Sequence, residues 1–230
     1  MENIRDNLAL VLGRIAAAAQ RCGRSPADIR LVAVAKTHPA EAVRAALEAG
    51  AAIIGENYIQ EARAKFEALI HCPAQWHFIG HLQSNKAKYA VRLFQLIHTV
   101  DSLGLGEELD RQAHKAGKVQ EILIQVNISR ETTKSGVSTA QAMALARDLA
   151  QLPNIKVKGL MTMPPYFDDP VRARPYFADL RHLRDDIRAL AIPKIDMLEL
   201  SMGMTGDFEA AIEEGATLVR VGTAIFGGRS

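Results

Sequence analysis

The sequence lacks most features that would assign a protein to a specialised compartment or chemistry. Only two of its 230 residues are cysteines, Cys22 and Cys72, and their spacing fits neither a disulfide framework nor a metal or redox motif. No apolar run is long enough to span a membrane, and charges such as Glu2 and Arg14 interrupt the apolar N-terminus, unlike a signal peptide. The formal net charge of +2 gives no reason to expect nucleic acid or a membrane surface as a partner. We therefore expect a cytoplasmic protein with two reduced thiols and no bound metal.

What the sequence does contain is a regular alternation of short, β-rich apolar runs with helical segments rich in Ala, Leu, Glu and Arg. Eight runs predict strands, which end at Lys36, Asn57, Gly80, Asp101, Asn127, Met163, Gly203 and Gly227. Each predicted strand except the last precedes a predicted helix, and one further helix comes before the first strand. Such alternation is typical of a parallel sheet that is covered by helices.

Eight βα units favour closure of the sheet into a barrel over an open, doubly wound sheet. An open sheet usually carries a glycine-rich phosphate turn after its first strand, whereas the turn here reads AKTHP. The chain ends within a few residues of the eighth predicted strand, so we expect no second domain. The prediction is an α/β fold, a single (β/α)8 TIM barrel over residues 1–230 with an extra N-terminal helix.

Reactive side chains of such barrels gather at the C-terminal ends of the strands. Lys36 occupies this position, directly after the apolar segment LVAVA. A lysine there can extend its amine to solvent along an apolar stem. Alternatively, a desolvated amine is accessible in its neutral form and can attack a carbonyl group. Position alone leaves both interpretations open.

Two segments near the C-terminus predict an anion site. Residues 201–215, SMGMTGDFEAAIEEG, run from the seventh strand through a glycine-rich turn into a helix, and VRVGTAIFGGR places Gly222 and Thr223 at the next strand end. Small residues allow the backbone to approach a ligand, and free N–H groups at a helix start favour an anion. Phosphates recur between these two loops in this fold. The alternative for either segment is ordinary turn chemistry, with Thr205 or Asp207 as a helix N-cap.

Arg220 lies in the last strand, two residues before Gly222. If its side chain points into the barrel it needs a partner, because an unpaired buried charge is costly. A carboxylate would serve, and so would the ring nitrogen of a pyridine cofactor. Arginine only donates hydrogen bonds, so that nitrogen would stay unprotonated and the ring would be a poorer electron sink. Strand alternation alone does not decide whether Arg220 points inward or toward the helices.

The chain resembles the pyridoxal phosphate homeostasis proteins in LVAVAKTHP, IIGENYIQEA, WHFIGHLQSNK, QVNISRETTKSG, VKGLMTM and SMGMTGDFEAAIEEGATLVRVGTAIFGGR, a resemblance that spans residues 1–229. It implies a barrel similar to the N-terminal domain of alanine racemase and of eukaryotic ornithine decarboxylase. It also implies that pyridoxal 5′-phosphate is bound as an aldimine on Lys36, that Arg220 faces the pyridine nitrogen, and that Asn57 lines the ring site. The residues implied for the phosphate are Ser201, Met202, Gly203, Gly222 and Thr223.

Three positions depart from the pattern of this family. Thr205 stands where serine is common, which keeps a hydroxyl available. Ala35 replaces a serine that is frequent before the lysine, which removes one hydrogen bond near the aldimine. His81 occupies a position where proline is familiar, so a titratable group would lie at the mouth of the site. We interpret His81 as a surface loop histidine, because no matched acid is identifiable.

The resemblance implies a protein that binds pyridoxal phosphate, buffers the free aldehyde and delivers it to apo-enzymes through transient contacts, with no catalytic residue of its own. Lys86 and Lys134 would offer docking points during transfer, although solvated surface lysines are the simpler interpretation. We expect a monomer, because the partner domain that makes related racemases dimeric is missing.

The main alternative is a pyridoxal-phosphate-dependent amino-acid racemase. Two-base racemization needs an acid–base group on each face of the substrate carbon. Racemases of this fold take the opposing tyrosine from an additional C-terminal domain, and none of Tyr58, Tyr89, Tyr166 and Tyr176 lies in a motif that suggests this role. A third interpretation, a barrel enzyme acting on a small phosphorylated substrate, fits the anion site but leaves Lys36 unexplained except as an aldolase-type base.

Overall fold

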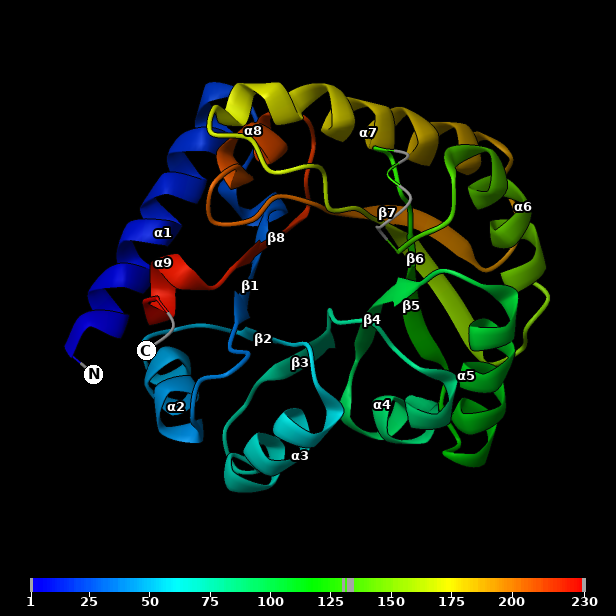
Figure 1. Cartoon of the computed structure of the whole chain (residues 1–230), viewed down its shortest axis with the longest axis horizontal. Coiled ribbons are helices and arrows are strands. Elements are labelled where there is room, and N and C mark those ends of the chain that lie inside the picture. Colours follow the sequence, from blue (N-terminus) through cyan, green and yellow to red (C-terminus); the bar gives the residue numbers. More distant parts are fainter. Residues whose placement is uncertain (1, 130, 132–134, 229–230) are drawn as a thin grey trace.

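The computed structural model describes residues 2–129, 131 and 135–228, which form a closed parallel β-barrel enclosed by helices (Figure 1). Neighbouring strands pair in chain order, and the last strand closes the barrel by pairing with the first. The strands are β1 (Arg30–Val34), β2 (Ile53–Glu56), β3 (Gln75–Phe78), β4 (Leu96–Val100), β5 (Gln120–Gln125), β6 (Ile155–Met161), β7 (Ile195–Ser201) and β8 (Leu218–Val221). The predicted (β/α)8 TIM barrel is confirmed.

An α-helix follows each of these strands, and the predicted N-terminal helix precedes them. The helices are α1 (Glu2–Arg21), α2 (Ala40–Glu48), α3 (Ile59–Ala68), α4 (Ala87–Leu93), α5 (Leu103–Lys115), α6 (Thr139–Leu149), α7 (Arg174–Ala189), α8 (Phe208–Glu213) and α9 (Thr223–Phe226). The prediction that the last strand runs to Gly227 with no helix after it is wrong. The Gly222 carbonyl accepts the N–H groups of Ile225 and Phe226 at 2.8 and 2.9 Å, so the chain turns into α9 directly after β8.

Helix α1 covers the outside of the barrel where the first and last units meet (Figure 1). Its buried side chains include Leu8, Val11 and Ile15, spaced as one face of an α-helix. This face packs beside α8, α9 and α2. Arg14 adds a two-bonded ion pair to Glu209 of α8, at 3.0 and 2.9 Å. Because α9 has only four residues, α1 supplies the cover that a longer final helix would give.

Strand alternation divides the core into two apolar regions. Outward-facing strand residues pack against the helices in the larger cluster, whereas a smaller cluster comes from the inward faces of the strands. The inward cluster consists of Val32, Ile53, Leu96, Leu123, Met161 and Leu218. Two residues further along β1 and β8, the inward positions are Val34 and Arg220, and both line a pocket above this apolar layer. The barrel interior is thus packed below and open at its C-terminal end.

Among the helices that the described residues form, none has both the length and the apolar character needed to cross a membrane. The two cysteines, Cys22 and Cys72, are both free and partly buried.

A close approach of β6 to β7 gives a test of the fold. Gly159 lies opposite Glu199, and a Cβ at this glycine would overlap with the Glu199 carbonyl oxygen. The two strand backbones must separate to relieve that overlap, so we expect Gly159→Ala to lower the free energy of unfolding by about 2–3 kcal/mol in urea denaturation. The control is Gly104→Ala in α5, where an added Cβ meets no atom within 4 Å and alanine is the better helix former. Equal free energies of unfolding for the two variants would contradict the β6–β7 register that places Gly159 opposite Glu199.

Candidate functional site

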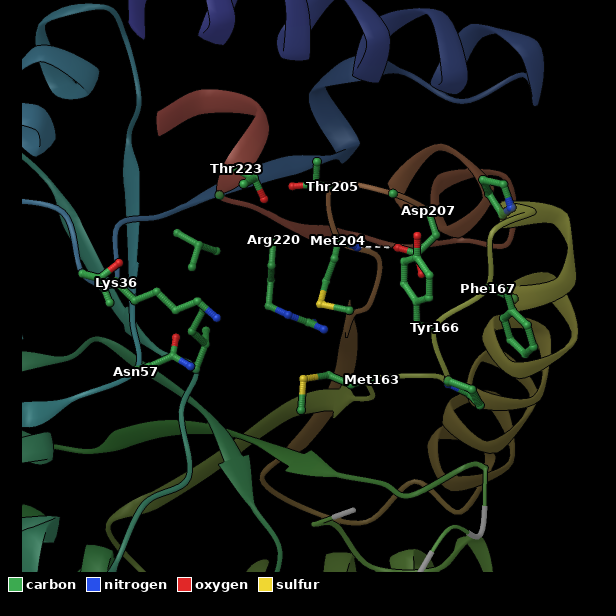
Figure 2. Close-up of a pocket in the computed structure, with 18 of the residues that line it drawn as sticks. Lys36, Asn57, Met163, Tyr166, Phe167, Met204, Thr205, Asp207, Arg220 and Thr223 are labelled. Carbon is green, nitrogen blue, oxygen red and sulfur yellow. Dashed lines mark hydrogen bonds between the residues drawn. The ribbon is translucent and has the colours of Figure 1, made fainter. Parts of the chain in front are cut away.

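A pocket of about 360 Å³ opens at the C-terminal ends of the strands. The residues that line it are Val34, Lys36, Thr37, His38, Asn57, Ile79, Met163, Pro165, Tyr166, Phe167, Pro170, Ala173, Met204, Thr205, Gly206, Asp207, Arg220, Gly222, Thr223 and Gly227. The structure therefore brings together five residues predicted from the sequence: Lys36, Asn57, Arg220, Gly222 and Thr223. Figure 2 shows Lys36 and Asn57 on one side, with the Lys36 amine and the Arg220 guanidinium both directed toward the middle of the pocket.

The turn that carries Lys36 is held on both sides by α3. Before the lysine, the Ala35 carbonyl accepts a hydrogen bond from Lys65 Nζ at 2.6 Å. After it, the Thr37 N–H donates to Glu61 Oε2 at 2.9 Å. Thr37 has a φ of 67°, a left-handed conformation that is unfavourable for a β-branched residue and persists only where its surroundings fix it. The backbone around Lys36 is thus fixed before any ligand arrives.

A buried ion pair supports this turn from behind. Lys65 Nζ lies 2.6 Å from Glu56 Oε1, and both side chains are buried between β2 and α3. Burial raises the pKa of Glu56 to about 7, although the hydrogen bond and charge of Lys65 lower it. Glu56 directly precedes Asn57 at the end of the second predicted strand, whereas Lys65 was not predicted to have a role near the site. The one feature that could have indicated a role for Lys65 is its helical spacing from Ile59 and Ala62, which places it on the buried face of α3.

Arg220 points into the barrel, which resolves the alternative that strand alternation left open. Its side chain is buried, and it donates from Nη1 to Ser201 Oγ at 2.6 Å and from Nη2 to the Thr162 carbonyl at 2.9 Å. Burial lowers the pKa of Arg220 to about 10, while the charge of Asp207 raises it. Within the part of the chain that the structure describes, no carboxylate lies within ion-pair distance of this guanidinium. Arg220 is therefore a buried cation at the pocket wall without an ion-pair partner.

The turn between β7 and α8 and the start of α9 form the opposite wall. Asp207 occupies the N-cap position of α8, as the turn-chemistry alternative predicted, but its side chain accepts the Met204 N–H at 2.6 Å (Figure 2). The backbone N–H groups of Thr205, Gly206, Gly222 and Thr223 find no acceptor among the described residues. Four free donors in two adjacent turns form a concavity suited to an anion.

Asn57 contributes a second polar group that lacks a partner. Its Oδ1 atom is buried, and among the described residues nothing donates a hydrogen bond to it. Its backbone lies so close to Gly80 that a Cβ there would overlap with the Asn57 carbonyl oxygen. A buried acceptor with no donor is costly, so a ligand donor or an ordered water is expected at this atom.

Three residues predicted for the phosphate do not line the pocket. The Ser201 hydroxyl is fully buried and engaged by Arg220 and His98. Met202 packs into the outer apolar cluster, and Gly203 has a φ of 88° and accepts the Arg220 N–H through its carbonyl. Contact of these three residues with a cofactor stays a prediction. The wall itself is formed by the next residues along the chain, from Met204 to Asp207.

Other predicted positions lie away from the pocket wall. His81 is exposed in the loop after β3, consistent with a surface histidine. Lys86 is half-buried at the end of a short 3₁₀ turn, Ser84–Lys86. Lys134 lies outside the described residues.

The mouth of the pocket was not predicted from the sequence, apart from the position of Met163 at a predicted strand end. Met163, Tyr166 and Phe167 come from the segment after β6, and Met204 joins them from the turn after β7 (Figure 2). Tyr166 is 86% exposed although it lines the pocket. Neither helical nor strand periodicity applies to such loops, so nothing in the pattern distinguished Tyr166, Phe167 and Met204 from ordinary surface residues.

Comparison with known proteins places the chain in a family. It matches the family model described as alanine racemase, N-terminal domain, over residues 7–230. It is 45% identical over 230 residues to the pyridoxal phosphate homeostasis protein of Aquifex aeolicus (strain VF5), covering 99% of each chain. It is 44% identical over 234 residues to the pyridoxal phosphate homeostasis protein of Escherichia coli (strain K12), covering 100% of this chain and 98% of that one.

Solved structures agree with this assignment. PipY of Synechococcus elongatus PCC7942, with pyridoxal phosphate bound, has a TM-score of 0.82 and 38% identity, covering 94% of this chain and 100% of PipY. An alanine racemase of Clostridium difficile 630 has a TM-score of 0.73 at 18% identity, covering 97% of this chain and 57% of the racemase, a likeness of fold alone. Fold and site thus define a TIM-barrel protein of the alanine racemase N-terminal class. Within that class, the chain belongs to the pyridoxal phosphate homeostasis protein family, as the sequence resemblance indicated.

The buried Glu56–Lys65 pair predicts a pH dependence of stability. Because the pKa of Glu56 is raised to about 7 in the folded protein, the native state keeps a proton that the unfolded chain releases near pH 4.5. The free energy of unfolding should therefore fall as pH rises from about 4.5 to 7, by at most ~3 kcal/mol from this group. In Glu56→Gln we expect lower stability at pH 7 but a flatter dependence over this window, measured by urea denaturation.

The matched control for this prediction is Glu67→Gln. Glu67 is an exposed carboxylate on the same helical segment, paired with Arg63 at the surface. Surface pairs of this kind contribute little to stability, so the pH dependence should equal that of the wild type. Parallel curves for Glu56→Gln and the wild type would show that Glu56 does not titrate in this range.

Proposed function

We propose that this chain binds pyridoxal 5′-phosphate in the pocket described above and serves in pyridoxal phosphate homeostasis, holding the cofactor through Lys36 and buffering the free aldehyde. One observation carries the proposal: a lysine amine and a buried arginine, which has no carboxylate at ion-pair distance among the described residues, are directed into the same pocket. The family relationship supports it, since the relatives are named for this role and PipY holds the cofactor.

The residues present fit this group. Pyridoxal phosphate carries a phosphate, an aldehyde, a ring hydroxyl and a pyridine nitrogen. The free N–H groups of Thr205, Gly206, Gly222 and Thr223, with the two threonine hydroxyls, would hold the phosphate. Gly222 suits that position, because a Cβ there would lie only 3.1 Å from the Val34 carbonyl oxygen and would crowd the end of β1.

When bound, the cofactor supplies an aldehyde that condenses reversibly with a primary amine. Lys36 is the amine, and the backbone contacts from α3 hold it at the pocket wall. Arg220 would donate to the pyridine nitrogen, so this residue keeps that nitrogen unprotonated and weakens the ring as an electron sink. The chain's own groups therefore bind and orient the ring and do little to activate it.

We further propose that the protein acts as a carrier rather than an enzyme, in the cytoplasm and as a monomer, and meets apo-enzymes only transiently. The racemase alternative requires a second acid–base group opposite Lys36. Tyr166 lines the pocket from the loop after β6, but its side chain is 86% exposed, and no other described residue forms a hydrogen bond that would orient its hydroxyl. No observation of this site favours racemization over binding.

The Lys36 attachment can be tested directly. Wild-type protein incubated with pyridoxal phosphate should be yellow, and borohydride reduction should fix the cofactor on the peptide that contains Lys36, as mass spectrometry would show. In Lys36→Ala the fixed label should disappear. Phosphate-anchored binding should remain but weaken at least about tenfold, or ~1.4 kcal/mol. The control is Lys86→Ala, a lysine outside the pocket wall, which should label like the wild type. A colourless, unlabelled wild type would refute the proposed function.

Two measurements distinguish a carrier from a racemase. We expect cofactor-loaded protein to reactivate an apo pyridoxal enzyme in the presence of a scavenger for free aldehyde, which indicates delivery through contact. Failure to reactivate would limit the role to passive storage. We also expect no loss of optical rotation with alanine or a panel of other amino acids, and measurable racemization would contradict the carrier role.

A further inference from the structure

A chain of hydrogen-bonded side chains lies inside the barrel, behind Arg220. Arg220 Nη1 lies 2.6 Å from Ser201 Oγ, Ser201 Oγ lies 2.8 Å from His98 Nδ1, and His98 Nε2 lies 3.0 Å from His77 Nδ1. The four residues come from β8, β7, β4 and β3, and each is at most 4% exposed. We call this set the interior polar chain. It connects the pocket wall with the centre of the barrel, and two of its members, His98 and His77, have no role in the function proposed above.

The chemistry of its members favours a single arrangement of protons. Arginine has no acceptor, so Ser201 Oγ must accept from Arg220. The serine hydroxyl can then give its one proton to His98 Nδ1. With Nδ1 occupied as an acceptor, neutral His98 carries its proton on Nε2 and donates to His77 Nδ1. In each hydrogen bond of the chain, the donor is then the residue on the Arg220 side.

Both histidines are held in the neutral form that this arrangement needs. Burial lowers the pKa of His77 to about 3, and the charge of Arg30 lowers it further. Burial also lowers the pKa of His98 well below its usual range, helped by His77, Arg220 and Arg30. The charged groups that act on the two histidines are thus cationic, whereas the Asp207 carboxylate acts on Arg220 at the other end of the interior polar chain. A protonated imidazole beside the Arg220 guanidinium would be strongly disfavoured.

We propose that His98 is a positioning residue for Arg220: by accepting the Ser201 proton, it orients the Ser201 oxygen toward the guanidinium and fixes Arg220 at the cofactor site. The aligned dipoles of Ser201, His98 and His77 present their negative ends to the buried Arg220 cation, which forms no ion pair with a carboxylate in the described part of the chain. Such polarised chains are stronger than the sum of their separate bonds. Without the acceptor at His98, the Ser201 hydroxyl would be buried with an unsatisfied proton and would no longer hold Arg220 in place. The proposal rests on the proposed function only in taking pyridoxal phosphate as the partner of Arg220.

The alternative is that His98 merely fills space between strands. Two substitutions of His98 distinguish these roles, because each role predicts that a different one of the two variants binds the cofactor more weakly. His98→Asn keeps an acceptor near the position of Nδ1 but leaves a cavity, whereas His98→Leu keeps most of the volume and removes the acceptor. A positioning role makes leucine the worse variant, and a packing role makes asparagine the worse one. His114→Leu, at an exposed histidine of α5, is the control for the loss of a histidine.

The measurements are the dissociation constant for pyridoxal phosphate and the absorption spectrum of the bound cofactor. We expect His98→Leu to weaken binding at least tenfold and to shift the absorption maximum, because the contact of Arg220 with the ring changes. His98→Asn should stay within about threefold of the wild type, with an unshifted spectrum, and His114→Leu should match the wild type. A leucine variant with wild-type affinity and spectrum, or an asparagine variant worse than the leucine variant, would overturn the proposal.

A second measurement needs no cofactor and no folded variant. In ¹⁵N-histidine-labelled wild-type protein, His98 should be the neutral tautomer protonated at Nε2 between pH 5 and 8. A signal for Nδ1–H, or for a charged ring, would refute the interior polar chain as drawn. If the wild type fails to bind pyridoxal phosphate, the proposed function fails, while the tautomer still decides whether His98 serves Ser201.

Discussion

The guanidinium of Arg220 is a full charge placed inside a closed barrel, and the arrangement of the site follows from what is needed to keep it there. Its pKa is lowered by burial to about 10, and among the described residues it has no carboxylate at ion-pair distance. The Thr162 carbonyl and the Ser201 hydroxyl offset part of the cost of burial. Both groups come from the strand ends beside the pocket, so the contacts that hold the cation also determine which way it faces.

The opposite side of the pocket is fixed by a different interaction. Lys36 lies in a turn whose backbone is held by Lys65 and Glu61 of α3, on either side of the lysine. Lys65 is itself bound to the buried Glu56, so the position of the turn depends on an ion pair between β2 and α3. The site therefore has two halves, an amine held from the helix layer and a cation held from the barrel interior. The two halves are brought together by the β1–β8 pairing that closes the barrel.

The sequence predicts well whatever depends on local pattern. The alternation of strands and helices is enough for the (β/α)8 barrel, and the residues at strand ends include Lys36, Asn57, Gly222 and Thr223 of the pocket. Short-range sequence patterns do not predict side-chain orientations and contacts that depend on residues far away in the sequence. Alternation fixes which residues of β8 share a face with Arg220, but the closure of the barrel decides that this face is the interior. His77 and His98 lie 21 residues apart in sequence, and His98 and Ser201 lie 103 residues apart.

A site that holds its ligand through both ends of the ring is suited to binding, whereas catalysis also requires interactions that become stronger in the transition state. Tight interactions in the ground state lower the dissociation constant but accelerate no reaction unless they strengthen in the transition state. In the proposed function Arg220 would act against such strengthening, because an arginine that donates to the pyridine nitrogen leaves this nitrogen unprotonated and the ring a poorer electron sink. The proposed role of the interior polar chain agrees with this, since burial lowers the pKa of both His77 and His98 and so disfavours a protonated histidine behind the arginine. In the proposed function, the one role left for Lys36 would be to hold an aldehyde reversibly.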